Sequence, residues 1–90
     1  MYIVIFSQKA QQDLKELKKS EPQAYKKARL LIEELADHPK IGRGKPQLKK
    51  YDLEGLYARK ITDKHRLVYS INDEIITVNV LSARGHYNDK

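Results

Sequence analysis

The chain has 90 residues, no cysteine and a formal net charge of +6, which restricts it to one small domain, expected over residues 1–90, with a single hydrophobic core. The absence of cysteine excludes disulfides and thiolate metal sites, and three histidines without ligand spacing give no reason to expect a metal or another cofactor. The apolar run at residues 2–6 is too short for a membrane span or a signal-peptide core, so we expect a soluble, cytoplasmic protein with no membrane partner.

The first half of the chain predicts one strand and two helices. Residues 2–6 are aromatic or β-branched and predict a strand that is buried on both faces or nearly so. A helix is predicted over residues 8–19, because Ala10, Leu14 and Leu17 form one apolar stripe. Ser7 is its expected N-cap, and Ser20 before Pro22 is a second start signal, for a helix over residues 22–37. The two helices are expected to form an antiparallel hairpin.

The second half predicts a sheet. After a glycine-containing loop at residues 42–46, a short strand is expected within residues 48–53. Three further strands are expected over residues 56–62, 65–71 and 75–82, with turns at residues 63–64 and 72–74. The order of elements predicts an α+β fold, in which an N-terminal strand and a two-helix hairpin pack with a small curved, mostly antiparallel sheet.

The turn at residues 63–64 predicts which side chains share a face of this sheet. If these two residues form the tip of a hairpin, Arg59 lies opposite Val68, and Arg59 and Arg66 become diagonal neighbours on one face, about 7 to 8 Å apart. Leu67 and Tyr69 then lie on the other face, against the helices. The face with the two arginines is expected to be uncovered, and planar guanidinium groups suit the binding of a phosphate there.

The positive charge is concentrated in residues 43–66, where eight Lys or Arg and three acids give a local net charge of +5. Such a segment is typical of a surface that binds a polyanion, although a solvated basic surface is an equally good interpretation from charge alone.

Arg66, His86 and Tyr87 together indicate RNA cleavage. When a ribose 2′-OH attacks the adjacent phosphorus, arginine can stabilise the developing charge and histidine can protonate the departing 5′ oxygen. An aromatic side chain such as Tyr87 offers a stacking platform for an unpaired base. Each residue alone has a simpler interpretation, since Arg66 can pair with Asp73 or Glu74, while His86 can be solvated and Tyr87 can cover a sheet edge. The combination on a basic sheet face favours cleavage.

Several motifs resemble the Txe/YoeB toxins, which belong to the RelE/ParE superfamily of bacterial toxin-antitoxin systems. These motifs are Gly44-Lys45-Pro46, Asp52-Leu53-x-Gly55, Tyr57-Ala58-Arg59-Lys60-Ile61-Thr62, His65-Arg66-Leu67-Val68-Tyr69 and His86-Tyr87. The resemblance implies a ribosome-dependent mRNA endoribonuclease that inhibits translation and is silenced by a cognate antitoxin, as a homodimer or in a hetero-oligomer with that antitoxin. It further implies that Arg66 stabilises the transition state, that His86 is the general acid and that Tyr87 lies beside it. By the same resemblance, the residues expected to bind ribosomal and messenger RNA are Lys45, Lys49, Lys50, Arg59, Lys60 and Arg84.

The chain departs from the family at residue 47. The family pattern is Gly-Lys-Pro-Glu, with the glutamate taken as general base, whereas this chain has Gln47. An amide cannot accept the 2′ proton at neutral pH. Catalysis is then weakened, or another group such as Glu54 or a ribosomal nucleobase is the base, or the chain was altered to be harmless. Gln47 also favours a second hypothesis, a non-catalytic or ParE-like toxin that acts through protein or ribosome contacts.

Overall fold

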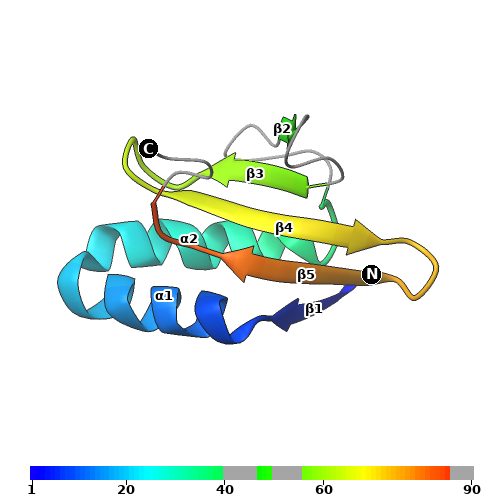
Figure 1. Ribbon diagram of the computed structural model, residues 1–90, viewed down its shortest axis with the longest axis horizontal. Coiled ribbons are helices and arrows are strands. Elements are labelled where there is room, and N and C mark those ends of the chain that lie inside the picture. Colours follow the sequence, from blue (N-terminus) through cyan, green and yellow to red (C-terminus); the bar gives the residue numbers. More distant parts are fainter. Residues whose placement is uncertain (40–46, 50–55, 86–90) are drawn as a thin grey trace.

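In the computed structural model of the chain, two helices cover one face of a sheet (Figure 1). The structure describes residues 1–39, 47–49 and 56–85, and of residues 47–49 it describes the backbone alone. Along these residues the elements follow in the order β, α, α, β, β, β, β. This confirms the predicted α+β arrangement of an N-terminal strand, a helical hairpin and a mostly antiparallel sheet.

The described strands form a five-stranded sheet in the order β1-β5-β4-β3-β2. Strand β1 (Ile3–Phe6) runs parallel to β5 (Thr77–Ser82), and all other neighbouring pairs are antiparallel. The remaining strands are β2 (Gln47–Lys49), β3 (Leu56–Lys60) and β4 (Arg66–Asn72). The predicted strands are thus confirmed with slightly different ends.

Strand β1 is less buried than the sequence predicts. Val4 and Phe6 pack against the core, but Ile3 and Ile5 are 65% and 49% exposed. Alternate side chains of a strand point to opposite faces, and β1 is an edge strand of a sheet that the helices cover on one face only. The prediction that this strand is buried on both faces is therefore wrong.

Helices α1 (Gln8–Ser20) and α2 (Pro22–Leu35) form the predicted antiparallel hairpin (Figure 1). The Ser7 hydroxyl accepts a hydrogen bond of 3.0 Å from the Ala10 N–H, which confirms the N-cap of α1. Ser20 does not cap α2. Its hydroxyl donates to the carbonyl of Glu16 within α1, and Glu21 alone joins the two helices.

The core lies between the helical hairpin and the inner face of the sheet. Leu67, Tyr69, Val78 and Val80 are fully buried there, as the alternation in β4 and β5 predicts. The helices contribute the apolar stripes identified in the sequence, with Ala10, Leu17, Ala24, Ala28, Leu31 and Leu35 buried. Among the described residues, no helix has the length and apolar character that crossing a membrane requires.

The register between β3 and β4 differs by one residue from the prediction. Arg59 pairs with Leu67, and Lys60 pairs with Arg66, so that five residues, 61–65, connect the strands. The predicted two-residue tip would have placed Arg59 opposite Val68. A shift of one residue moves a side chain to the other face. Arg59 therefore lies on the helix-covered face with Leu67 and Tyr69, and the prediction that it shares the uncovered face with Arg66 is wrong.

Candidate active site

The turn between β3 and β4 is built by Thr62. Its hydroxyl accepts hydrogen bonds from the backbone N–H groups of Lys64 (3.1 Å) and His65 (3.2 Å). The Ile61 N–H closes the turn by donating to the His65 carbonyl at 3.0 Å. A side chain that satisfies two backbone donors stabilises a wider turn than a two-residue hairpin tip. The five-residue connection sets the register that separates Arg59 from Arg66.

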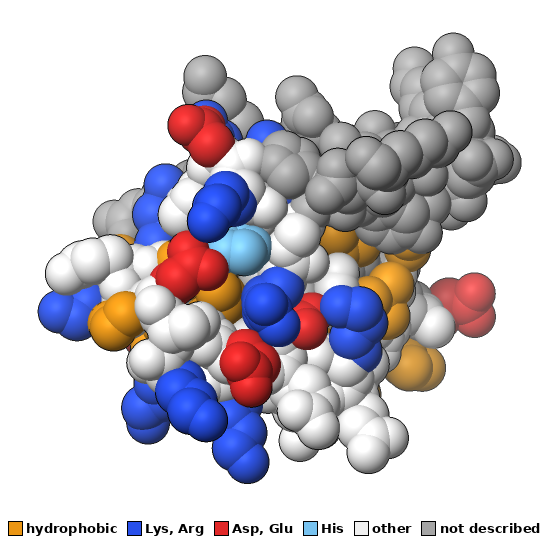
Figure 2. Space-filling view, turned by 60° about the vertical axis from the view of Figure 1, so that its left-hand side comes forward, with side chains coloured by type: hydrophobic (Ala, Val, Ile, Leu, Met, Phe, Trp, Pro, Cys, Tyr) orange, Lys and Arg blue, Asp and Glu red, His pale blue; other side chains and the backbone are white. Residues whose placement is uncertain are grey.

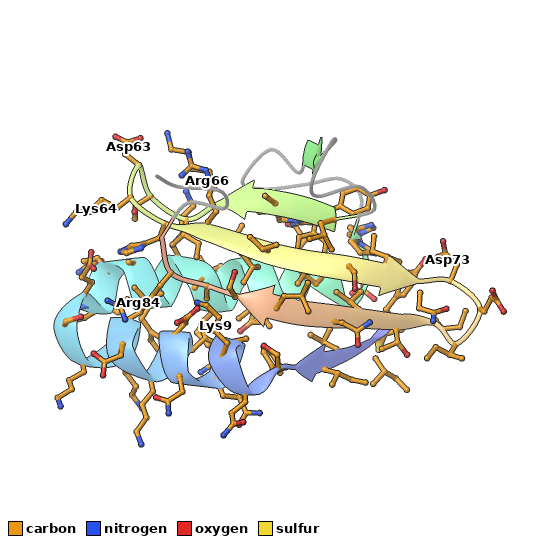
Figure 3. All side chains as sticks on the ribbon, in the orientation of Figure 1. Lys9, Asp63, Lys64, Arg66, Asp73 and Arg84 are labelled. Atoms are coloured by element: carbon orange, nitrogen blue, oxygen red, sulfur yellow. The ribbon has the colours of Figure 1, made fainter. Side chains whose placement is uncertain are left out.

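Arg66 lies directly after this turn, at the start of β4. One terminal nitrogen of its guanidinium donates to the carbonyls of Thr62 (2.6 Å) and His65 (3.1 Å). Among the described residues the other two guanidinium nitrogens have no hydrogen-bond partner, and the side chain is partly buried. Figure 3 shows Arg66 beside the turn that carries Asp63 and Lys64. The guanidinium is therefore fixed from one side and can still bind a phosphate oxygen with its remaining donors.

The C-terminal chain passes next to Arg66. The Arg66 N–H donates to the Gly85 carbonyl at 2.9 Å, and the Gly85 N–H donates to the His65 Nδ1, also at 2.9 Å. Gly85 has a φ of 73°, in the left-handed region that favours glycine. His86 follows Gly85 in the sequence, so the chain reaches its predicted general acid directly from a residue bonded to His65 and Arg66.

His65 connects this segment to the helical hairpin. Its Nε2 lies 2.8 Å from a carboxylate oxygen of Glu21, the residue between α1 and α2, and only 7% of the residue is exposed. The hydrogen bond from His65 is the main reason why the pKa of Glu21 lies below its usual 4.5. The positive charges of Lys64 and Arg84 act in the same direction.

Asp13 is a contributor to this region that the sequence analysis missed. It is 6% exposed, and its carboxylate accepts hydrogen bonds from the Ala83 N–H (3.0 Å) and the Lys9 ammonium (2.8 Å). The C-terminal chain is thus attached to α1 two residues before Gly85. A sequence signal existed, because Asp13 lies three residues after Ala10 and four before Leu17, on the apolar stripe of the helix.

Arg59 is a structural residue. It is fully buried, and its guanidinium donates to Glu34 (2.7 Å), to the Tyr69 hydroxyl (3.0 Å) and to the His38 carbonyl. Tyr69 donates in turn to the Pro39 carbonyl at 2.6 Å, and burial raises the pKa of Tyr69. A guanidinium enclosed in this way cannot contact RNA. The burial of Arg59 contradicts the sequence-based prediction that this residue binds RNA.

The other described basic residues lie on the surface. Lys60 pairs across the strands with Arg66, and its ammonium forms an exposed ion pair of 2.7 Å with Asp63. Arg84 is exposed and lies at the level of the helices in Figure 3, away from Arg66. Figure 2 shows Lys and Arg side chains interspersed with Asp and Glu on the face it presents. In the described segments no three His, Cys, Asp or Glu side chains are grouped to hold a metal ion.

Several predicted site residues lie outside this description. His86, Tyr87, Lys45 and Lys50 are not among the described residues, and for Gln47 and Lys49 only the backbone is described. In that backbone Gln47 pairs with Ala58, and Ala58 pairs with Val68 on β4. The register therefore aligns these three residues in one row across the sheet, and Arg66 lies two residues before Val68.

Comparison with known proteins places this geometry in a family. Residues 6–87 match the family described as YoeB-like toxin of bacterial type II toxin-antitoxin system. The chain is 32% identical to toxin YoeB of Escherichia coli K12 over 84 residues, which cover 93% of this chain and 98% of that one. A YoeB/ParE toxin structure from Agrobacterium tumefaciens superposes with a TM-score of 0.87 at 27% identity, over 94% of this chain and 99% of that one.

A second solved structure is that of a YoeB-YefM complex from Staphylococcus aureus. Its matched chain is 31% identical to this one and superposes with a TM-score of 0.80, over 97% of this chain and 99% of that chain. The family match covers nearly the whole sequence and both halves of the candidate site, the β3–β4 turn and the segment before His86. The chain belongs to the YoeB-like toxins of bacterial type II toxin-antitoxin systems.

Proposed function

We propose that this toxin is a ribosome-dependent endoribonuclease that cuts mRNA and thereby inhibits translation. The observation that carries the proposal is the arrangement at Arg66, whose guanidinium is held on one side by two turn carbonyls while its backbone binds Gly85, the residue before His86. Arg66 thus combines remaining hydrogen-bond donors with a direct backbone contact to the residue that precedes His86 in the sequence. A cation at the phosphoryl oxygens and an acid at the leaving oxygen both accelerate the cleavage of a phosphodiester.

The proposed reaction is an attack of the ribose 2′-OH on the adjacent phosphorus. The new O2′–P bond forms as the P–O5′ bond breaks, which gives a 2′,3′-cyclic phosphate and a free 5′-hydroxyl. Arg66 stabilises the charge on the phosphoryl oxygens, and His86 gives its proton to the departing 5′ oxygen. Tyr87 lies next to the general acid in the sequence, and its proposed role is to stack on a base.

Removal of the 2′ proton requires a general base, and the family's base is not present in this chain. Gln47 occupies the base position of the family pattern but cannot take a proton at neutral pH. Three explanations are compatible with the proposed reaction. Catalysis is weakened, or another group such as Glu54 or a ribosomal nucleobase takes the proton, or residue 47 was altered to make the chain harmless. A carboxylate at residue 47 should raise the rate if catalysis is weakened or the residue was altered, and should leave it unchanged if another group is the base.

The proposed contacts with ribosomal and messenger RNA come from surface cations. Lys60 is on the described surface beside Arg66, and Arg84 is exposed one residue before Gly85. Lys45, Lys49 and Lys50 belong to the basic segment that the sequence identifies, and they are retained as proposed phosphate contacts.

The partner of the toxin is proposed to be a cognate antitoxin. The relative from Staphylococcus aureus was solved as a YoeB-YefM complex and also as a YoeB dimer. By this analogy we propose a hetero-oligomer with an antitoxin, and a homodimer for the free toxin.

The test is cleavage of a defined message on programmed ribosomes, with the message ends mapped. We expect the wild type to cut and Arg66→Ala to lose about 10² to 10³ in single-turnover rate, the effect of removing one donor to a developing anion. Lys64→Ala is the matched control, because it removes an exposed cation two residues away. Equal rates for wild type and Arg66→Ala would overturn the role of Arg66.

The second candidate function is that of a non-catalytic toxin that acts by binding, like ParE-like proteins. Gln47 favours it, because an amide cannot act as the general base. Such a protein would bind ribosomes or another target and arrest growth without new message ends. If neither the wild type nor a Gln47→Glu variant cuts the message while ribosome binding persists, this second function replaces the first.

A further inference from the structure

The geometry points to His65 as a positioning residue, which holds the backbone of Gly85, the residue that precedes the proposed general acid His86 in the sequence. This inference rests on the proposed ribonuclease function. Its starting point is that His65 and Arg66, adjacent in the sequence, bind both polar backbone groups of Gly85. The His65 Nδ1 accepts from the Gly85 N–H and the Arg66 N–H donates to the Gly85 carbonyl, each at 2.9 Å.

These contacts define the protonation state of the ring. A backbone N–H can only donate, so Nδ1 must carry a lone pair and no proton. In the neutral ring the proton is then on Nε2, and it donates to the Glu21 carboxylate at 2.8 Å. Glu21 therefore selects the tautomer that can accept from Gly85. The sequence of contacts from the helix junction to the C-terminal chain is Glu21, His65 and Gly85.

The effect of this hold is local. Ala83 is attached independently, because its N–H donates to the buried carboxylate of Asp13 at 3.0 Å. Loss of the His65 contact would therefore leave Ala83 in place and free the N–H of Gly85, whose carbonyl keeps its bond to the Arg66 N–H. The left-handed backbone of Gly85 (φ 73°) makes the direction of the following chain sensitive to this release. A displacement of about 1 Å at a reacting group costs about 10²-fold in rate.

Two amide substitutions separate the two contacts of the ring. The side-chain oxygen of asparagine can occupy the position of Nδ1, so His65→Asn keeps an acceptor for the Gly85 N–H and loses the contact with Glu21. Glutamine is longer and its amide nitrogen can occupy the position of Nε2, so His65→Gln keeps a donor to Glu21 and leaves the Gly85 N–H without an acceptor. Both variants are neutral and polar, which makes them a matched pair.

The first readout does not depend on RNA cleavage. We expect nuclear magnetic resonance of the wild type to find an unprotonated Nδ1 at neutral pH, and hydrogen exchange of the Gly85 amide to accelerate in His65→Gln and to stay near the wild-type rate in His65→Asn. A proton on Nδ1 in the wild type, or an unchanged Gly85 exchange rate in His65→Gln, would overturn the inference. The protonation of the His65 Nδ1 is measured in the wild type, so this result does not depend on whether the variants fold.

The second readout is single-turnover cleavage on programmed ribosomes, measured in the wild-type background or in Gln47→Glu if that variant cuts faster. We expect His65→Gln to lose about 10²-fold while His65→Asn stays within about threefold, because only the asparagine keeps the hold on Gly85. Equal losses in both variants would make His65 merely structural and refute the positioning role. If neither background cuts at all, the proposed function fails instead, and the Gly85 exchange rates still report whether the hold exists.

Discussion

At the scale of single residues, Arg59 and Arg66 have the same side chain and opposite surroundings. Arg59 is fully buried, with a carboxylate, a hydroxyl and a carbonyl around its guanidinium. Arg66 is held by one terminal nitrogen and has no described partner for the others. A charge that is already paired and desolvated cannot respond to a phosphate, whereas a partly held one can. Only Arg66 is suited to act on a reacting group.

Residue 47 gives the sharpest test of the catalytic proposal. Gln47→Glu would supply a carboxylate able to take the 2′ proton, so we expect single-turnover cleavage to rise by a factor of about 10² to 10⁴, the range that general bases supply. Gln47→Ala is the control, and we expect no gain from it. The measurement is message-end mapping on programmed ribosomes, and growth arrest on expression without antitoxin should increase in parallel. An unchanged rate with ribosome binding intact would mean that the base is provided elsewhere.

At the scale of the elements, the Arg59 cluster joins the end of α2 to the middle of the sheet. Arg59 on β3 binds Glu34 in the last turn of α2, and Tyr69 on β4 binds the carbonyl of Pro39 just beyond that helix. Tyr57 stacks on Tyr69 with ring centroids 5.6 Å apart. This network fixes the point at which the chain leaves the helical layer.

We expect Arg59→Ala to destabilise the fold rather than to weaken RNA binding directly. Removing one partner of a fully buried ion pair typically costs about 3 to 5 kcal/mol. Because Glu34 is 22% exposed, we expect a smaller loss, seen as a lower denaturant midpoint in equilibrium unfolding. Lys60→Ala is the neighbouring control, since its side chain is 52% exposed and a surface substitution changes stability by about 0.5 kcal/mol or less. If Arg59→Ala were as stable as Lys60→Ala, the structural role of Arg59 would be refuted.

The junction between α1 and α2 predicts a specific acid sensitivity. Because the pKa of Glu21 in the folded protein lies below 4.5, its contribution to stability is present above pH 4.5 and is lost as the pH falls through the lower, folded value. We expect the stability difference between wild type and Glu21→Gln to be constant near neutral pH and to shrink below pH 4.5. Urea unfolding across the acid range measures this difference.

If the stability curves of wild type and Glu21→Gln were parallel throughout this pH range, the hydrogen bond between His65 and Glu21 would not contribute to folding.

At the scale of the whole molecule, the helices cover one face of the sheet (Figure 1). On the other face, Lys60 and Arg66 pair across the ends of β3 and β4. We expect an antitoxin to silence the proposed activity by covering this cationic end with an acidic segment. Opposite charges accelerate association, so the association rate should fall steeply as salt increases.

Binding kinetics with the purified antitoxin would test this placement. Arg66→Ala should weaken the complex by about 2 to 5 kcal/mol if the guanidinium is buried against a carboxylate, whereas Lys26→Ala, an exposed cation on α2, should leave affinity nearly unchanged. Equal affinities for wild type and Arg66→Ala would place the antitoxin on another face without refuting the pairing itself.

The order of the elements, their inner faces and the family can all be read from the amino-acid sequence alone. Alternation along residues 66–72 and 77–82 identifies the buried residues of β4 and β5, and the spacing of Ala10, Leu14 and Leu17 identifies the inner face of α1. These patterns report local geometry, with periods of two and 3.6 residues, and are readable without neighbours. The motifs around Arg66 and before Tyr87 likewise indicate the family from the residues alone.

The partners of the buried polar side chains, in contrast, follow from how the elements pack against one another. The hydroxyl of Thr62 widens the β3–β4 turn, and the resulting one-residue shift carries Arg59 into the core. Asp13, Glu21 and His65 receive their partners from segments far along the chain. A register slip leaves the hydrophobic pattern of each strand unchanged while exchanging the faces of one strand relative to the next. Periodicity therefore could not distinguish the buried arginine from the one at the candidate active site.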